Sequence, residues 1–298
     1  MVWISFALLG AVFTSLTTIF AKIGIKDVKS NFATFYRTGI VIIASFILCA
    51  ISGSIKFVFK LSFENYLFLF LSGIATGCSW LCYYKALKLG TVNQVAPIDK
   101  SSFILTTILF LIFFFNDTTK NGNVITIVML IVSMILMLSG TLLMISKKKE
   151  EKVVDKTWLL YAVLSSVFAS IVSLFVKIGL KGISSDLGTL LRTIIVFIFA
   201  GTIAFIRKEH KDIKNIKKKS WLFLTFSGLA TGGAWLFEYA ALNYAGANPV
   251  AVNSIGKLSI LLTMIFSASI LKEKFSLKSI IGLSLLIMGI VVIVVFSL

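Results

Sequence analysis

Acidic residues, histidine, cysteine and proline are all scarce in this chain of 298 residues. It has 12 acidic residues, one histidine, three cysteines and two prolines. The cysteines, Cys49, Cys78 and Cys82, lie inside apolar segments and lack the spacing of a zinc site or a disulfide framework. The histidine, His210, lies in a basic loop, and no Ser/His/Asp set, metal-ligand cluster or phosphate loop is apparent. We therefore expect neither an enzyme nor a bound cofactor or metal.

Apolar residues are abundant instead. The chain is 58% hydrophobic and 14% charged, whereas soluble domains are roughly 45–50% apolar and about 25% charged. Its mean hydropathy is +1.01. Val2–Phe20, Phe103–Phe115 and Ile280–Leu298 are nearly continuous apolar runs, and about 20 such residues cross a bilayer core. The composition predicts an integral membrane protein, and we interpret the run from Val2 as a retained helix rather than a cleaved signal peptide.

Hydrophobic segments separated by short polar connections predict an all-α membrane fold with ten transmembrane helices. The predicted segments are 2–25, 32–52, 66–88, 94–115, 123–146, 158–180, 187–206, 221–243, 248–271 and 277–297.

The two halves of the chain read onto each other at an offset of 155 residues. The matches include Trp3 with Trp158, Lys22-Ile23-Gly24 with Lys177-Ile178-Gly179, Arg37-Thr38 with Arg192-Thr193, Ala75-Thr76-Gly77 with Ala230-Thr231-Gly232, and Trp80 with Trp235. Apolar bias alone does not align tryptophan, lysine, arginine and glycine at one offset. The sequence therefore predicts a first five-helix repeat at 1–146, a basic linker at 147–157 and a second five-helix repeat at 158–298.

An odd number of helices per repeat predicts that the second repeat enters the membrane in the opposite orientation to the first. The distribution of basic residues in the loops agrees with this prediction. Nineteen lysines and arginines fall in loops on the side away from the N-terminus, and four fall on the other side. The excess of basic residues predicts that the side with nineteen of them is cytoplasmic and that both termini face outward. Because the basic residues lie in short loops, the high net charge does not indicate nucleic-acid binding.

Eight ionisable residues fall inside or at the ends of the predicted helices. They are Lys22, Arg37, Asp99, Lys100, Lys177, Arg192, Glu238 and Lys257. Ionisable groups at membrane depth indicate a functional site by default, although snorkelling to the interface and structural ion pairs are alternatives. Glu238 and Lys257 are at a similar depth for an ion pair, and Arg37 is at a suitable depth for Asp99.

Matched glycines and aromatics complete the pattern. Gly73-xxx-Gly77 and Gly228-xxx-Gly232 favour close helix packing, with a hinge as the alternative. The only prolines, Pro97 and Pro249, are expected to mark helix starts. The candidate substrate-binding residues are Lys100, Lys257, Asp99, Glu238, Arg37, Arg192, Trp80, Trp235, Tyr84 and Tyr239. The four aromatics among them line a cavity or belong to the core or lipid-facing surface.

These residues resemble the motifs of the drug/metabolite transporter superfamily and, within it, of the EamA family. The resemblance is carried by Lys22-Ile23-Gly24, by Arg37-Thr38, by Gly73-Ile74-Ala75-Thr76-Gly77 with Trp80 and Tyr84, and by Ala96-Pro97-Ile98-Asp99-Lys100-Ser101. It implies transport of small metabolites, often export of amino acids or related compounds, without ATP. Ten-helix members usually have their termini in the cytosol, which is opposite to the orientation that the charges predict.

Three functions remain open on the sequence. The first is a secondary exporter of amino acids or similar zwitterions, working by alternating access between the inverted repeats. The second is a transporter of anionic or phosphorylated metabolites, since buried basic residues outnumber acids. The third is a membrane scaffold or lipid-handling protein. The expected location is the cell membrane, multi-pass. The expected partners are a small-molecule substrate and membrane lipid, with a proton and a homodimer as further options and no nucleic acid.

Overall fold

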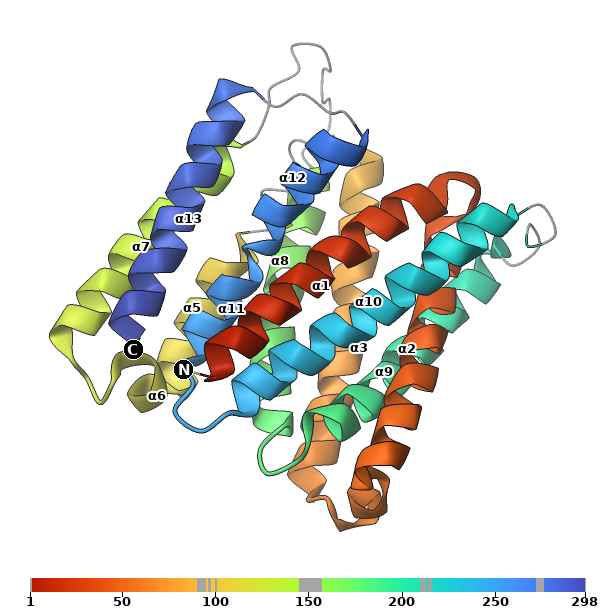
Figure 1. Cartoon of the computed structure of the whole chain (residues 1–298), viewed down its shortest axis with the longest axis horizontal. Helices are drawn as coiled ribbons and strands as arrows, with labels where there is room; N and C mark the ends of the chain where they lie inside the picture. The colour runs from red at the N-terminus through yellow and green to blue at the C-terminus, as the bar shows by residue number, and fades with distance from the viewer. Residues whose placement is uncertain are drawn as a thin grey trace.

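The computed structural model describes residues 2–89, 95, 98–99, 101–144, 157–209, 213, 216–271 and 276–297. Within these residues the chain is helical and has no strands (Figure 1). The elements are α1 (Val2–Gly24), η1 (Ile25–Asp27), α2 (Ser30–Ser52), η2 (Ser54–Lys60), α3 (Phe63–Leu89), α5 (Ser102–Phe113), α6 (Phe115–Thr119), α7 (Val124–Leu143), α8 (Thr157–Gly179), α9 (Ser185–Ile206), α10 (Lys218–Asn243), α11 (Pro249–Gly256), α12 (Ser259–Leu271) and α13 (Leu277–Ser297).

Eight helical segments of the described chain are long and apolar enough to cross a membrane. They correspond to eight of the ten predicted segments. The predicted segment 221–243 lies within α10, which has 26 residues but carries lysines in its first turn and Glu238 near its end. The predicted segment 94–115 is represented by α5, a helix of 12 residues, and part of that segment lies outside the described residues.

The predicted helix 248–271 is divided into α11 and α12. Asn248 caps α11 by accepting from the backbone N–H groups of Val250 and Ala251, and Pro249 occupies the first turn, as predicted. At the division the backbone N–H of Lys257 bonds to Ser254 and that of Leu258 to Ile255, at 2.9 Å each, so the spacing tightens from four residues to three. Glycine weakens a helix locally, and Gly256 directly precedes this turn.

Helices far apart in the sequence pack in pairs. The extensive pairs are α1 with α10, α3 with α8, α2 with α9, and α7 with α13 (Figure 1). Glycines allow the close approaches. A Cβ on Gly24 would lie 3.0 Å from Leu224, and one on Gly179 would lie 3.0 Å from Leu69. These two contacts are related by the 155-residue offset, with the contributing halves exchanged.

The predicted small-residue patterns also serve packing. A Cβ on Gly73 of α3 would lie 2.7 Å from the Cβ of Ile195 on α9. A Cβ on Gly228 of α10 would lie 2.8 Å from the Cβ of Ile40 on α2. Both contacts join the third helix of one repeat to the second helix of the other, so residues related by the offset again exchange partners.

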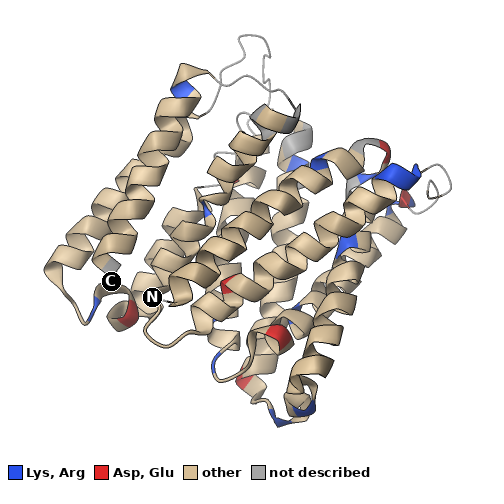
Figure 2. Cartoon of the chain, in the orientation of Figure 1, with Lys and Arg blue, Asp and Glu red and all other residues tan. Residues whose placement is uncertain are grey.

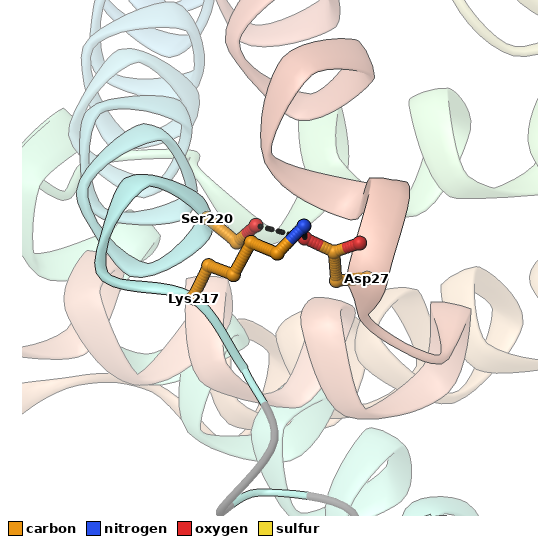
Figure 3. A network of polar contacts seen from close by, with 3 residues as sticks. All are labelled: Asp27, Lys217 and Ser220. Carbon is orange, nitrogen blue, oxygen red and sulfur yellow. Dashed lines mark hydrogen bonds and ion pairs between the residues drawn. The ribbon is translucent and has the colours of Figure 1, made fainter.

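Polar contacts join the two halves at both ends of the bundle. Near the end of α1, Lys217 lies 3.6 Å from Asp27, and the hydroxyl of Ser220 donates to the same carboxylate at 3.5 Å (Figure 3). Next to it, Glu209 accepts from the backbone N–H groups of Asn31 and Phe32 at 3.0 Å each, which places an anion at the N-terminus of α2. Figure 2 shows that charged segments lie mostly at the ends of helices.

At the opposite end of the bundle, the contacts between the two halves are donated by an asparagine amide and by serine hydroxyls. The Asn65 side-chain amide at the start of α3 donates to the carbonyls of Gly179, the last residue of α8, and of Lys181, at 2.9 Å each. The Asp186 carboxylate accepts from the hydroxyls of Ser52 and Ser54 at 2.5 and 2.6 Å. These contacts tie the loop after α2 and the start of α3 to the end of α8 and the start of α9.

Candidate functional site

Arg192 is the centre of the candidate site. It lies on α9 in a span that otherwise presents mostly apolar residues, and only 3% of its surface is exposed. Its Nη2 donates a hydrogen bond of 2.7 Å to the Thr76 hydroxyl on α3. Its Nε and Nη1 are buried, and neither has a hydrogen-bond partner within the described residues. Leaving a buried charged donor unpaired costs more than about 1–3 kcal/mol, so these two nitrogens require an explanation.

Two aromatic rings of α10 enclose the same guanidinium. The guanidinium carbon of Arg192 lies 4.5 Å from the centroid of the Trp235 ring and 5.8 Å from that of Tyr239. Residues four apart share one face of a helix, so α10 presents both rings to α9. A cation over an aromatic face is stabilised by the ring quadrupole. The two rings therefore stabilise the positive charge of the buried guanidinium.

Glu238 brings a negative charge to this cluster. It precedes Tyr239 on α10 and interacts electrostatically with Lys257 and with Arg192. Lys257 lies where α11 ends and α12 has not yet begun. Glu238 and Lys257 are thus close enough to interact electrostatically, and the ion pair between them stays a prediction. The cluster combines two cations and one anion from α9, α10 and the α11–α12 turn.

Arg37, which matches Arg192 at the 155-residue offset, makes the equivalent contact with the other half. Nη2 of Arg37 on α2 donates to the Thr231 hydroxyl on α10 at 2.8 Å. Thr231 lies 3.4 Å, oxygen to oxygen, from Thr17 on α1. Arg37 and Arg192 differ by 155 residues, as do Thr76 and Thr231. Each half thus supplies an arginine to a threonine of the other half.

A second polar group surrounds Asp99. Its carboxylate accepts a hydrogen bond of 2.8 Å from the Ser165 hydroxyl on α8. The Ser79 hydroxyl on α3 donates to the Ser165 carbonyl at 3.1 Å. The sequence suggested Arg37 as the partner of Asp99, but the hydrogen bonds described for these two residues lead to Thr231 and Ser165 respectively.

The EamA-like transporter family matches residues 1–139 and 156–295. The chain belongs to this family. A relative from a Sinorhizobium species, described as an uncharacterized transporter in the cobO 3' region, is 43% identical over 103 residues, which are 35% of this chain and 73% of that protein. A crystal structure of a protein is similar to this chain with a TM-score of 0.70 at 13% identity, and the match covers 98% of both chains, a likeness of fold alone.

Membership of the EamA family and the apolar helices together make the chain a multi-pass membrane protein. The family and the description of the relative indicate a membrane transporter rather than an enzyme. Both conclusions agree with the sequence prediction. Among the described residues, no group of three or more His, Cys, Asp or Glu side chains could hold a metal ion.

Not every predicted site residue of this EamA-family chain joins the Arg192 cluster. Trp80 lines a cavity of only about 10 Å³ with Asn31, Thr34 and residues of α3 and α9, which is about enough for one water. Lys100 and the side chain of Tyr84 lie outside the described residues. The predicted group therefore divides into the Arg192 cluster, the Arg37 contact, the Asp99 group and Trp80.

Lys177 is explained by helix capping. Its ammonium donates a hydrogen bond of 2.5 Å to the carbonyl of Leu242 near the end of α10. A cation at a helix C-terminus is favoured by the free carbonyls and the helix dipole. The snorkelling interpretation of Lys177 is therefore replaced by a contact between the two helices α8 and α10.

Sequence reasoning missed Thr76 and Thr231 as site residues. Both lie in the Ala-Thr-Gly triplets that defined the repeat, but neither is ionisable, so a search for charge at membrane depth passes over them. A useful signal was available, because a threonine conserved between the two halves next to a packing glycine is a hydrogen-bond partner placed at a close helix contact.

Proposed function

We propose that this protein is a secondary transporter that carries small zwitterionic metabolites, amino acids or related compounds, out of the cell by alternating access. The observation that carries the proposal is the buried Arg192, whose Nε and Nη1 have no partner within the described part of the chain. Ionised groups inside a membrane span are costly and are found where substrates or ions pass. A substrate carboxylate is the ligand that a guanidinium fork fits best.

The geometry of the guanidinium supports a two-point contact. Nη2 carries two N–H groups, of which Thr76 receives one. One N–H of Nη2 is parallel to an N–H of Nη1, and the other is parallel to the N–H of Nε. Whichever of the two Thr76 accepts, the remaining N–H of Nη2 forms a fork with Nη1 or with Nε, and both of these atoms lack a partner in the described chain. One complete fork is therefore left for a carboxylate. In this proposal Glu238, which interacts with Arg192 electrostatically, binds the substrate amine.

Transport of an anionic metabolite is the second candidate. The observation that favours it is the charge of the cluster, in which Arg192 and Lys257 outnumber Glu238. On this alternative Lys257 and Arg192 both bind the anion, and Glu238 only balances the charge of the empty site. The two candidates differ in what Glu238 does when substrate is bound.

The architecture behind the proposal is a pair of inverted five-helix repeats at 1–146 and 158–298, joined by the linker 147–157, with ten membrane crossings. The exchanged contacts support it, because Arg37 with Thr231 and Arg192 with Thr76 relate the halves by a two-fold exchange. Such repeats commonly place the substrate at their interface and rock around it. The turn at Lys257 supports the site, since interrupted helices often form substrate sites in transporters.

Uptake of radiolabelled amino acids into proteoliposomes, screened against organic acids and sugar phosphates, tests the proposal. We expect amino acids to be carried, and Arg192→Gln to lower the initial rate at least tenfold. Arg192→Lys keeps the charge but not the fork, and should recover only a small part of it. Arg207→Gln, at the exposed end of the same helix, is the matched control and should transport normally. Normal amino-acid flux in Arg192→Gln would refute the proposed site.

A further inference from the structure

A groove opens on the outer surface of the bundle between α3 and α9. It has a volume of about 390 Å³ and is lined by Phe63, Tyr66, Leu67, Leu69, Phe70, Leu191, Ile194 and Ile195. Phe63 is 79% exposed and Phe70 is 46% exposed. Both helices belong to predicted membrane spans, so the groove faces the hydrocarbon of the bilayer and its occupant must be apolar.

The groove has a closed inner end. Gly73 brings α3 so close to α9 that an added Cβ would lie 2.7 Å from the Cβ of Ile195. Leu69 is fixed from behind by Gly179 on α8, at 3.0 Å from its would-be Cβ. The helices therefore touch at Gly73 and separate toward the start of α3. An elongated apolar ligand that enters from that end lies between α3 and α9 and cannot pass the helix contact at Gly73.

The open end of the groove lies beside two lysines. The Tyr66 hydroxyl donates a hydrogen bond to the carbonyl of Val58, which joins the groove to η2. In η2 the ammonium groups of Lys56 and Lys60 lie 5.3 and 5.9 Å from the Phe57 ring centroid. Aromatic and basic side chains together are typical of the membrane interface. The cations therefore stand at headgroup level where the groove opens.

Two carboxylates, those of Asp186 and Glu64, lie near this end of the groove. Asp186 accepts from the hydroxyls of Ser52 and Ser54. Glu64 lies about 100° around the helix from Phe63 and about 60° from Leu67, at the edge of the groove. Among the described residues neither Lys56 nor Lys60 forms an ion pair, so both ammonium groups are available to a phosphate at the mouth of the groove.

We propose that the α3–α9 groove binds one acyl chain of an anionic phospholipid, whose phosphate is held by Lys56 and Lys60. The volume is within the roughly 300–1,000 Å³ of small-ligand sites, and basic residues beside an apolar groove are a pattern of anionic-lipid recognition. The site is separate from the substrate cluster, because Arg192 is buried while its neighbour Ile194 lines the groove. A bound chain supports α9 from behind Arg192.

Native mass spectrometry of the full-length protein in detergent, titrated with phosphatidylglycerol or phosphatidylcholine, tests the proposal. We expect one phosphatidylglycerol to bind with clear preference over phosphatidylcholine. The double variant Lys56→Gln and Lys60→Gln should bind phosphatidylglycerol about tenfold more weakly, because each basic residue near the surface adds several-fold to the affinity for anionic lipid. The charge-matched control is Lys120→Asn with Lys278→Gln, two exposed lysines elsewhere, and should bind like the wild type.

Leu67→Trp tests the acyl-chain part of the site, because the larger side chain fills the groove. It should weaken binding of both lipids, while its melting temperature without lipid shows whether the fold is intact. Equal binding of the two lipids, or unchanged preference in the Lys56/Lys60 variant, would overturn the proposal. So would a disulfide-linked dimer formed by Phe63→Cys at high yield in membranes, since a second copy would then occupy the groove. If Leu67→Trp does not fold, the lysine variants alone decide the result.

Discussion

Arg192 on α9 donates a hydrogen bond to Thr76 on α3, and this bond fixes one of three guanidinium nitrogens while the other two have no partner among the residues that the structure describes. The threonine orients the arginine from the half of the chain to which the arginine does not belong. The buried cation thus belongs to the second half of the chain, and its hydrogen-bond acceptor belongs to the first half. Any relative movement of α3 and α9 changes the direction in which its open fork points.

Removal of the Thr76 hydroxyl tests this orientation. Thr76→Val keeps the shape of the side chain but leaves Nη2 without its acceptor, so we expect a loss of roughly 1–3 kcal/mol of stability and weaker substrate binding. Thermal unfolding in detergent measures the first, and ligand-induced thermal shift the second. In a double-mutant cycle with Arg192→Met the two effects should be less than additive. Strict additivity would show that the bond contributes nothing.

Substitution of Glu238 separates the two candidate substrate classes. Glu238→Gln removes the negative charge that faces Arg192 and Lys257 but keeps the size of the side chain. For a zwitterionic substrate we expect transport to fall at least tenfold, because the amine loses its counter-charge. For an anionic substrate we expect transport to persist or increase. Proteoliposome uptake with both substrate classes gives the answer, and Glu64→Gln, an exposed acid on α3, is the control.

The close contact between α7 and α13 predicts that one methyl group added at Gly140 strongly destabilises the protein. A Cβ on Gly140 would lie 2.5 Å from the carbonyl oxygen of Gly282 and 2.7 Å from the backbone nitrogen of Leu286. Backbone atoms cannot turn aside, so Gly140→Ala must separate the helices and should cost at least about 1–3 kcal/mol. The control is Gly232→Ala, whose Cβ would meet Val41 at 3.6 Å. A lower melting temperature in Gly140→Ala alone is the expected result.

The two polar contacts between the η1–α2 region and the segment before α10 should differ in strength. Glu209 accepts three hydrogen bonds from Asn31 and Phe32 at the start of α2, so Glu209→Ala should lower stability by about 1–2 kcal/mol. Lys217 is 76% exposed and lies 3.6 Å from Asp27, and Lys217→Ala should change stability by less than about 1 kcal/mol. Equal effects in denaturation would contradict this ranking.

Cysteine labelling tests the proposed orientation. Lys60 lies in η2 and Lys208 lies after α9, in loops that follow the second helix of each half. With Cys49, Cys78 and Cys82 replaced, Lys60→Cys should react with an impermeant maleimide added to intact cells, and Lys208→Cys only after the membrane is opened. The reverse pattern would place the termini inside. Labelling of both from one side would refute inverted repeats.

Much of this fold was predictable, because the lengths of the hydrophobic segments and the internal repeat can be read directly from the sequence. The segments around α1, α2, α7 and α13 are found by hydropathy alone. The turn at Lys257 was not predicted, since a single glycine inside an apolar run does not reveal where hydrogen bonds tighten. Likewise α6 was not predicted, because Phe115–Thr119 continues an apolar run with polar residues over less than two turns.

The candidate site was predicted in its charges but not in its contacts. Charge at membrane depth selected Arg192, Glu238 and Lys257, and Glu238 interacts electrostatically with the other two. The same rule selected Lys177, which the structure uses to cap α10. Sequence position gives the depth of a residue but not the direction in which its side chain points, so capping and binding roles cannot be separated before the helices are packed.

The Arg37–Thr231 and Arg192–Thr76 hydrogen bonds have a consequence for how mutations in the two halves depend on each other. Each arginine lies in one half of the chain, and its threonine acceptor lies in the other half. Either half alone would therefore leave its arginine without that acceptor. A substitution at either threonine can be compensated only at the arginine of the opposite half.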